Sequence, residues 1–450
     1  MSDGALRRGL SPGKHRMERL LSWAWSHRVE IGIVWGLWFI WGKLAELMPA
    51  PLALVVMLAA AGGVYMCAPL REAIWHWYTW SRCRRRFMAA CRHAGVMNGY
   101  EQVPKPVELK QIPVGEQLRV KMPAGIHTGD VGEGCETLAA TLAAREVRVV
   151  KDRANASYAD VTIVRENPFA EGPALVWPFL DAPAVSLWKP IPVGVAEDGS
   201  QATILLPERH LLLGGEPGGG KSVALQQIIA AAALHPDVAL TLFDANRVQL
   251  SLWKGCAERF VGPDVNDGIA VLEELRDDMD RRYEWLESVR RRTLRLGDPF
   301  SFRVVGMDEL ALFTARGGKK ACAQFSTLTE DLVARGRAAG IIVVAATQRP
   351  SHDIIPTSLR DLFPFRWAMR CNTPQASDTI LGQGWASQGF SATNIDAAER
   401  GVGFLLHEGG LPIRLRSYYL ADEHLESIAA RAEALRRQVA GQVVPENGRV

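Results

Sequence analysis

The chain has 450 residues, of which 48% are hydrophobic and 22% charged, so it is long enough for two or three domains and too apolar for a disordered protein. A formal net charge of +3 excludes a strongly basic protein, and any nucleic-acid contact must therefore come from local basic patches. The seven cysteines are scattered without a Cys-x-x-Cys pair, which excludes a disulfide scaffold and a zinc ribbon.

The N-terminal segment combines uncharged runs with basic flanks. Residues 47–70 carry no charge and are long enough to cross a hydrocarbon core of ~30 Å as a helix, whereas the uncharged run 31–42 is shorter. Tryptophans, which gather at membrane interfaces, are concentrated in the first 80 residues. Arginines lie on both outer flanks and are absent from the connection around Pro49, so the positive-inside rule places both termini in the cytoplasm.

These features predict a multi-pass protein of the cell membrane. The expected parts are a basic cytoplasmic N-terminus (1–28), a hairpin of two transmembrane helices (29–70) and a basic juxtamembrane segment (71–96). A single span followed or preceded by an interfacial helix is the alternative.

Residues 97–190 are soluble in character and predict a small α+β domain. An Ala- and Leu-rich helix is expected at 136–145. Apolar and polar residues alternate in three strand-like segments, 117–122, 146–151 and 160–165. Nothing in this domain resembles a catalytic site, and the turn-forming residues of 183–199 connect it to the next domain.

Residues 191–420 predict an α/β domain, because short apolar runs alternate with helical stretches. The expected strands are 210–213, 238–243, 302–307 and 341–346. The expected helices are 223–234, 268–292 and 324–339. This alternation is typical of a mainly parallel sheet with helices on both faces. A last amphipathic pattern predicts a C-terminal helix and tail at 421–450.

A phosphate-loop pattern follows the first expected strand of the α/β domain. It consists of Gly215, Glu216, Pro217, Gly218, Gly219, Gly220, Lys221 and Ser222, and Val223 comes next in the expected helix. The glycines let backbone N–H groups point into one concavity, and the helix adds its positive end. Lys221 is then expected to reach the β- and γ-phosphates of ATP, while the Ser222 hydroxyl binds Mg²⁺.

Two further strand ends carry the polar groups that ATP hydrolysis needs. The run 302–307 ends at Asp308, which is expected to hold the Mg²⁺ shell, and at Glu309, which is placed to polarise the attacking water. Another run ends near Gln348, which is placed to sense the γ-phosphate or its water. Together with the phosphate loop, these residues favour ATP hydrolysis over a helix cap at the acidic pair.

The order and spacing of these segments resemble the FtsK/SpoIIIE family of ring-shaped DNA-pumping ATPases. Matching segments are Gly220-Lys-Ser-Val223, Asp308-Glu-Leu-Ala311, Gly336-Arg-Ala-Ala-Gly-Ile341 and Ala346-Thr-Gln-Arg-Pro-Ser351. Three others are most similar to the branch encoded by actinobacterial conjugative plasmids (Tra): Phe243-Asp-Ala-Asn-Arg-Val-Gln-Leu-Ser-Leu-Trp253, Asp378-Thr-Ile-Leu-Gly-Gln-Gly-Trp385 and Gly401-Val-Gly-Phe-Leu-Leu406. The resemblance covers about residues 185–420 and implies a RecA-like P-loop ATPase core.

The resemblance also implies a homo-hexamer that threads double-stranded DNA through its channel and binds nucleotide between subunits. Arg337 would be the finger that reaches the neighbouring subunit's γ-phosphate. Arg349 and Arg360 would contact DNA phosphates independently of sequence. The second channel loop of the family corresponds to Pro374–Asp378, which lacks basic residues. No winged-helix reader is expected after residue 420, so recognition of a DNA site would come from a partner such as an accessory transfer protein, or be absent.

The expected function is a membrane-anchored, ATP-driven pump that moves double-stranded DNA between cells during conjugative transfer of a plasmid or integrative element. The alternatives are a chromosome-segregation or cell-division DNA pump and a substrate-export ATPase of a protein secretion system. Such exporters often carry several tandem ATPase domains, and this chain has one phosphate loop. An ABC transporter is disfavoured because Thr293–Pro299 is not the Leu-Ser-Gly-Gly-Gln-like signature expected before the Asp308 strand.

Overall fold

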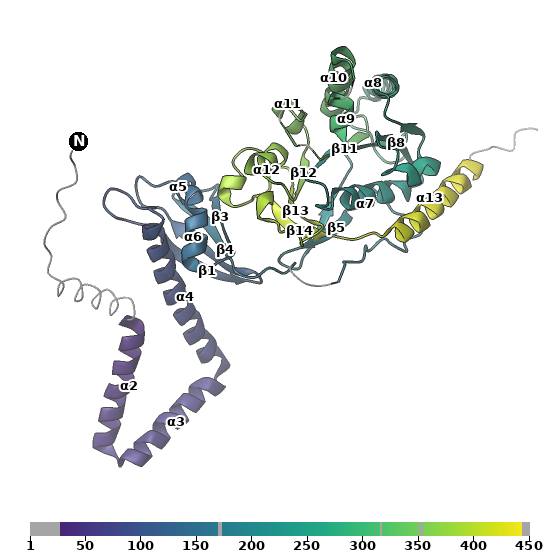
Figure 1. Cartoon of the computed structure of the whole chain (residues 1–450). Coiled ribbons are helices and arrows are strands. Elements are labelled where there is room, and N and C mark those ends of the chain that lie inside the picture. Colours follow the sequence, from purple (N-terminus) through teal and green to yellow (C-terminus); the bar gives the residue numbers. More distant parts are fainter. Residues whose placement is uncertain (1–27, 170–172, 316, 349, 352–353, 443–450) are drawn as a thin grey trace, which may run out of the picture.

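The computed structural model describes residues 28–169, 173–315, 317–348, 350–351 and 354–442. Three consecutive helices lead into a small four-stranded sheet, which is followed by a ten-stranded sheet with helices on both faces and a final helix (Figure 1). The expected α/β class, with a large and mostly parallel sheet, is confirmed.

The N-terminal helices are α2 (Arg28–Leu47), α3 (Ala50–Met66) and α4 (Ala68–His93), which form a bent arm beside the small sheet (Figure 1). Among the residues that the structure describes, no single helix is both long and apolar enough to cross a membrane. The segments Ala50–Gly63 and Ala68–His93 meet that criterion only as a pair, bent by 88°. The predicted transmembrane hairpin is thus not supported, and residues 1–27 of the predicted basic N-terminus lie outside the described residues.

Helix α4 changes character along its length. Its first half exposes Trp75 and Trp77. Its second half buries Phe87 and Cys91 in the core of the small sheet, which also contains Leu118 and Leu138. The segment that we expected to be a basic juxtamembrane connection is therefore one amphipathic helix, whose C-terminal half belongs to the small domain.

The small domain is an antiparallel sheet with the strand order β1-β2-β4-β3. Its strands are β1 (Lys105–Ile112), β2 (Gly115–Lys121), β3 (Glu146–Lys151) and β4 (Tyr158–Val164), and its helices are α5 (Thr128–Glu133) and α6 (Cys135–Leu142). Three of the four strands lie where alternation predicts them, and β1 is additional. The predicted helix 136–145 corresponds to α6.

The large sheet has the order β6-β5-β14-β13-β12-β7-β11-β10-β8-β9. In this order, each pair of neighbouring strands from β6 up to β12 is antiparallel, and each pair from β12 up to β9 is parallel. The strands are β5 (Ile191–Ala196), β6 (Gln201–Ile204), β7 (Leu211–Gly214), β8 (Val238–Asp244), β9 (Arg259–Val261), β10 (Phe302–Asp308), β11 (Ile341–Thr347), β12 (Phe365–Met369), β13 (Val402–Leu406) and β14 (Ile413–Ser417).

Helices cover both faces of this sheet (Figure 1). They are α7 (Lys221–Ala233), α8 (Val265–Ser288), α9 (Leu310–Ala315), α10 (Lys319–Arg335), α11 (Thr357–Arg360), α12 (Pro374–Leu381) and α13 (Asp422–Gln442), with short 3₁₀ helices at Ser251–Cys256, Ala386–Gln388 and Ala392–Asn394. The Ala-rich α7 is buried under α13 on one face. On the other face, Phe243 of β8 packs against Phe313 and Phe325 beneath α8 and α10.

The strand order determines where a site can form. Strand β7, which leads into the phosphate loop, lies between β11 and β12, and β10 follows β11. Because these four strands are parallel, their carboxyl ends meet at one edge of the sheet. The loops after β7, β10, β11 and β12 are therefore brought together there.

Candidate active site

The phosphate loop is fixed at the carboxyl edge of the sheet by the two strands that flank β7. The N–H of Gly215 donates a hydrogen bond to the carbonyl of Thr347, the last residue of β11, at 3.2 Å. The N–H of Glu216 donates to the carbonyl of Arg370 after β12, at 2.9 Å. Both bonds hold the start of the loop, which then turns into α7 at Lys221.

A turn ahead of β13 supports the same loop from the antiparallel half of the sheet. The N–H of Gly401 donates to the carbonyl of Gly219, at 3.2 Å. Gly220 has a φ of 104°, and a Cβ atom there would lie 2.7 Å from the Cα of Gly401. Glycine is therefore required at position 220 for both its conformation and the close backbone approach.

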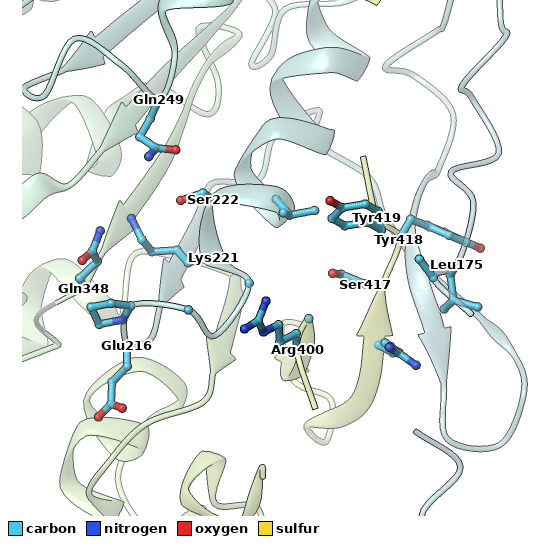
Figure 2. A pocket seen from close by; sticks show the side chains of 17 residues that line it. Leu175, Glu216, Lys221, Ser222, Gln249, Gln348, Arg400, Ser417, Tyr418 and Tyr419 are labelled. Carbon is cyan, nitrogen blue, oxygen red and sulfur yellow. The ribbon is translucent and has the colours of Figure 1, made fainter. Parts of the chain in front are cut away.

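A cavity of about 590 Å³ opens over the loop (Figure 2). Its size suits a nucleotide. The predicted loop residues that line it are Glu216, Pro217, Gly218, Gly220, Lys221, Ser222 and Val223; Gly215 and Gly219 are not among the lining residues. The other walls are formed by Ala174, Leu175, Gln249, Gln348, Arg400, Gly401, Arg416, Ser417, Tyr418 and Tyr419.

Lys221 and Asp308 form a buried ion pair at the floor of the site. The Lys221 Nζ atom lies 3.1 Å from Asp308 Oδ1 and 3.9 Å from Glu309 Oε2, and the three side chains are almost completely buried. Asp308 Oδ2 is buried and has no hydrogen-bond partner among the residues that the structure describes. An unpartnered carboxylate oxygen facing a phosphate loop fits a hard cation, so Asp308 and the Ser222 hydroxyl are suited to hold Mg²⁺.

Glu309 is held rigidly in an unusual conformation. Its φ of 59° lies in the left-handed region, which costs a non-glycine residue about 1–3 kcal/mol. Its Oε1 accepts a hydrogen bond from the Thr347 hydroxyl at 3.0 Å, and its Oε2 accepts one from the Gln348 N–H at 2.9 Å. The tip of β11 therefore orients this carboxylate beside Lys221, as a general base that acts on a bound water would require.

The remaining predicted residues fall at different places. The Gln348 side chain points into the cavity beside Lys221 (Figure 2). Arg337 lies ahead of β11, at the opposite edge of the sheet, where its Nε donates to the carbonyl of Glu208 at 2.6 Å. Arg349 lies outside the described residues. Arg360 is only 6% exposed, and its guanidinium is bound to Asp361 at 2.8 Å; it is a buried, paired residue in this structure, and its contact with DNA phosphates stays a prediction.

Several lining residues of the cavity were not predicted. Arg400, Arg416 and Tyr419 come from the antiparallel half of the sheet, and Leu175 comes from the segment between the two domains. The N–H of Tyr419 donates to the carbonyl of Leu175 at 2.8 Å, which ties these two walls together. The sequence signal for this wall is the motif that begins at Gly401, and in the structure Gly401 supports the phosphate loop through its hydrogen bond to Gly219.

Comparisons with known proteins agree with this architecture. Residues 184–301 match the model of the FtsK/SpoIIIE family. The chain is 27% identical over 350 residues to the DNA translocase FtsK of Staphylococcus aureus and 26% identical over 353 residues to that of Streptococcus pyogenes. Each alignment covers 72% of this chain and 42% of the relative, so the chain spans less than half the length of the curated relatives it matches.

Solved structures share the fold at lower identity. The monomer form of the pCW3 conjugation coupling protein TcpA with ATPγS matches with a TM-score of 0.54 and 17% identity, covering 78% of this chain and 99% of TcpA. EssC (ATPases 2 and 3) from Geobacillus thermodenitrificans matches with a TM-score of 0.50 and 15% identity, covering 61% of this chain and 53% of EssC. Residues 184–301 are thus similar to the FtsK/SpoIIIE family, and this similarity agrees with the phosphate loop and with the fold shared with TcpA.

Proposed function

We propose that this protein is an ATP-hydrolysing motor that moves double-stranded DNA. The observation that carries this proposal is the convergence of Lys221, Asp308 and Glu309 beside a nucleotide-sized cavity. The neighbouring Gln348 adds a polar side chain that faces the same space. A buried lysine beside a phosphate loop, paired with one carboxylate and close to a second that is held in place by hydrogen bonds, is the set of groups that phosphoryl transfer to water needs.

Each residue then has a defined part in hydrolysis. When ATP binds, the Lys221 ammonium group exchanges its partner Asp308 for the β- and γ-phosphates. The N–H groups of the phosphate loop donate hydrogen bonds to oxygens of the same phosphates. Bound Mg²⁺ would neutralise phosphate charge, with Ser222 and Asp308 as its ligands. Glu309 accepts a proton from the attacking water, and Gln348 orients that water or the γ-phosphate.

We infer that the working unit is a ring, a homo-hexamer, in which Arg337 completes the neighbour's site. Its position at the opposite edge of the sheet keeps Arg337 away from the cavity of its own subunit. An arginine that supplies transition-state charge in trans makes hydrolysis depend on assembly. Arg349 and Arg360 are the proposed DNA contacts in the channel, and Arg360 would have to leave its pair with Asp361 to make one.

The proposed setting is conjugative transfer at the cell membrane. The curated relatives are named DNA translocases. The structural match to the conjugation coupling protein TcpA covers 99% of that protein. Helices α2 and α3 expose large apolar side chains such as Trp35, Trp38 and Leu58, which supports an apolar environment around them. We place both termini in the cytoplasm and expect accessory transfer proteins to select the DNA.

The test is ATPase activity of the full-length chain with and without duplex DNA, at two salt concentrations. Duplex DNA should stimulate the rate, and higher salt should reduce the stimulation because phosphate contacts release counterions. The Lys221→Ala variant should neither bind nor hydrolyse ATP. An unstimulated rate in assembled rings, or normal turnover by Lys221→Ala, would contradict the proposal.

A substrate-export ATPase of a protein secretion system, the alternative that the sequence left open, is the second candidate, because such an ATPase would need the same hydrolytic residues. In the same assay, stimulation by a folded protein substrate and not by duplex DNA would favour that candidate. A chromosome-segregation pump would instead be favoured by stimulation that depends on an orienting DNA sequence.

A further inference from the structure

A buried cluster of charges joins the small domain to the nucleotide site. At its centre is Glu399, which is 4% exposed and precedes β13. Its Oε1 accepts hydrogen bonds from Arg145 Nη2, at 2.8 Å, and from Asn167. Its Oε2 accepts one from Arg414 Nη2 of β14, at 2.9 Å. Arg145 and Asn167 flank β3 and β4 of the small domain, so one carboxylate is shared by two sheets.

The charge on Glu399 is firmly held. Burial alone would raise the pKa of this carboxyl, but Arg414 and Arg145, together with the N–H of Asp396, outweigh burial and lower the pKa below its usual value. A buried carboxylate with four donors cannot move without breaking several charge-assisted hydrogen bonds. Its backbone is fixed as well, because its carbonyl accepts a hydrogen bond from the Val402 N–H at 3.2 Å.

The next two residues reach the nucleotide cavity. Gly401 supports Gly219 and Gly220 of the phosphate loop, as described above. Arg400 lines the cavity, and its guanidinium lies beside the loop (Figure 2). Among the residues that the structure describes, the Arg400 side chain has no ion-pair partner, so its charge is available to an anion in the cavity.

We propose that Arg400 binds the phosphates of the nucleotide and that the small domain sets its position through the Arg145–Glu399 pair. Arg400 is then a binding residue, whereas Arg145 and Glu399 are positioning residues. Because coupling between two sites is reciprocal, docking of the small domain strengthens nucleotide binding, and nucleotide binding tightens the docking of the small domain. This inference rests on the proposed function, since it assumes that the cavity takes ATP.

The test is a double-mutant cycle on the full-length chain, with the Kd of ATPγS and Mg²⁺ measured by titration calorimetry. Arg400→Ala should raise the Kd by about tenfold, and it should weaken competition by inorganic tripolyphosphate to the same extent, because the lost contact is to phosphate. Arg145→Ala should raise the Kd by about fivefold. In the Arg400→Ala background, the same Arg145→Ala change should have almost no further effect.

Controls separate positioning from general damage. Arg119→Ala removes an arginine of the same small sheet that pairs with Asp152 and lies over the Tyr158 ring, away from Glu399, and it should leave the Kd unchanged. Arg145→Lys keeps the charge and should restore most of the affinity. If Arg145→Ala lowers the melting temperature in the absence of nucleotide, Asn167→Ala is the alternative variant, because it removes a different hydrogen bond to the Glu399 carboxylate.

Each outcome bears on one proposal. If Arg145→Ala weakens binding equally in both backgrounds, or if Arg400→Ala leaves the Kd unchanged, the positioning scheme is wrong even though the ATP site stands. If the wild-type chain binds no ATPγS, or if Lys221→Ala binds it normally, the proposed ATP site itself fails.

Discussion

Replacing Arg337 by alanine should abolish hydrolysis in the assembled ring and leave nucleotide binding to each subunit intact. The reason is the distance between Arg337 and its own site. Strand β11 has seven residues, and at about 3.3 Å per residue it is about 20 Å long. Arg337 lies ahead of its first residue, while Thr347 at its far end contacts Glu309. An arginine side chain cannot cover that length, so any contact of Arg337 with a γ-phosphate would have to be with the nucleotide of a neighbouring subunit. Loss of an arginine finger costs about 10³- to 10⁵-fold in rate.

A mixing assay tests this geometry directly. Arg337→Ala subunits retain an intact phosphate loop, and Lys221→Ala subunits retain an intact finger, so each variant alone should be inactive. In a head-to-tail ring formed from equal amounts of both, about a quarter of the interfaces combine an intact Lys221 with an intact Arg337. The mixture should therefore recover up to about a quarter of the wild-type ATPase rate.

The matched control is Arg335→Ala, two residues away. Arg335 pairs with Asp280 and Asp331 on the surface of its own subunit, so its removal should change the rate less than twofold, within the ~0–1 kcal/mol typical of surface ion pairs. Mixed rings that assemble but recover no activity, or an isolated Arg337→Ala subunit that no longer binds nucleotide, would refute the assignment in trans.

Two further predictions follow from buried groups of the same sheet. Glu309→Gln should bind ATP normally but lower single-turnover hydrolysis by about 10²-fold or more, and a loss of less than tenfold would exclude Glu309 as the general base. Burial, aided by the charge of Arg337, lowers the pKa of His210 from 6.5 to about 3, so the folded state favours neutral imidazole. The resulting stabilisation is complete above pH 6.5 and is lost at about 1.4 kcal/mol per pH unit as the pH falls from 6.5 toward 3. Urea unfolding at pH 6.5 and 5.5 should show this loss in the wild type and a smaller loss in His210→Asn, and equal losses in both would contradict it.

The parallel half of the large sheet could be predicted from sequence because its information is local. Strands β7, β8, β10 and β11 are short apolar runs buried on both faces, and each is followed by a helix or by a recognisable motif. The phosphate loop and the Asp308–Glu309 pair lie at the ends of such runs. Knowing that the strands are parallel is enough to bring these residues to one edge.

The antiparallel half could not be predicted in the same way, because its strands are defined by their partners. Strand β14 has the sequence Ile-Arg-Leu-Arg-Ser and buries Arg414, which is tolerated because its guanidinium pairs with Glu399 and donates a hydrogen bond to Asn167. Strand β5 contains Pro192 and Gly194 and resembles a linker until it pairs with β14. The same limitation explains Arg360, whose burial depends on packing and on the adjacent Asp361 and which therefore looked like an exposed basic residue in the sequence.

The two halves of the sheet thus contribute different things to one site. The residues that we propose for hydrolysis come from the parallel half, in the phosphate loop and at the ends of β10 and β11. Arg400, Arg416 and the wall at Tyr419 come from the antiparallel half, which is bonded to the small domain through Glu399. A DNA pump and a protein exporter of the same fold would need the same hydrolytic residues. What distinguishes the two must therefore lie outside the motifs, in the channel loops and in the antiparallel half. There, residues that contact the small domain are bonded to residues that line the nucleotide cavity.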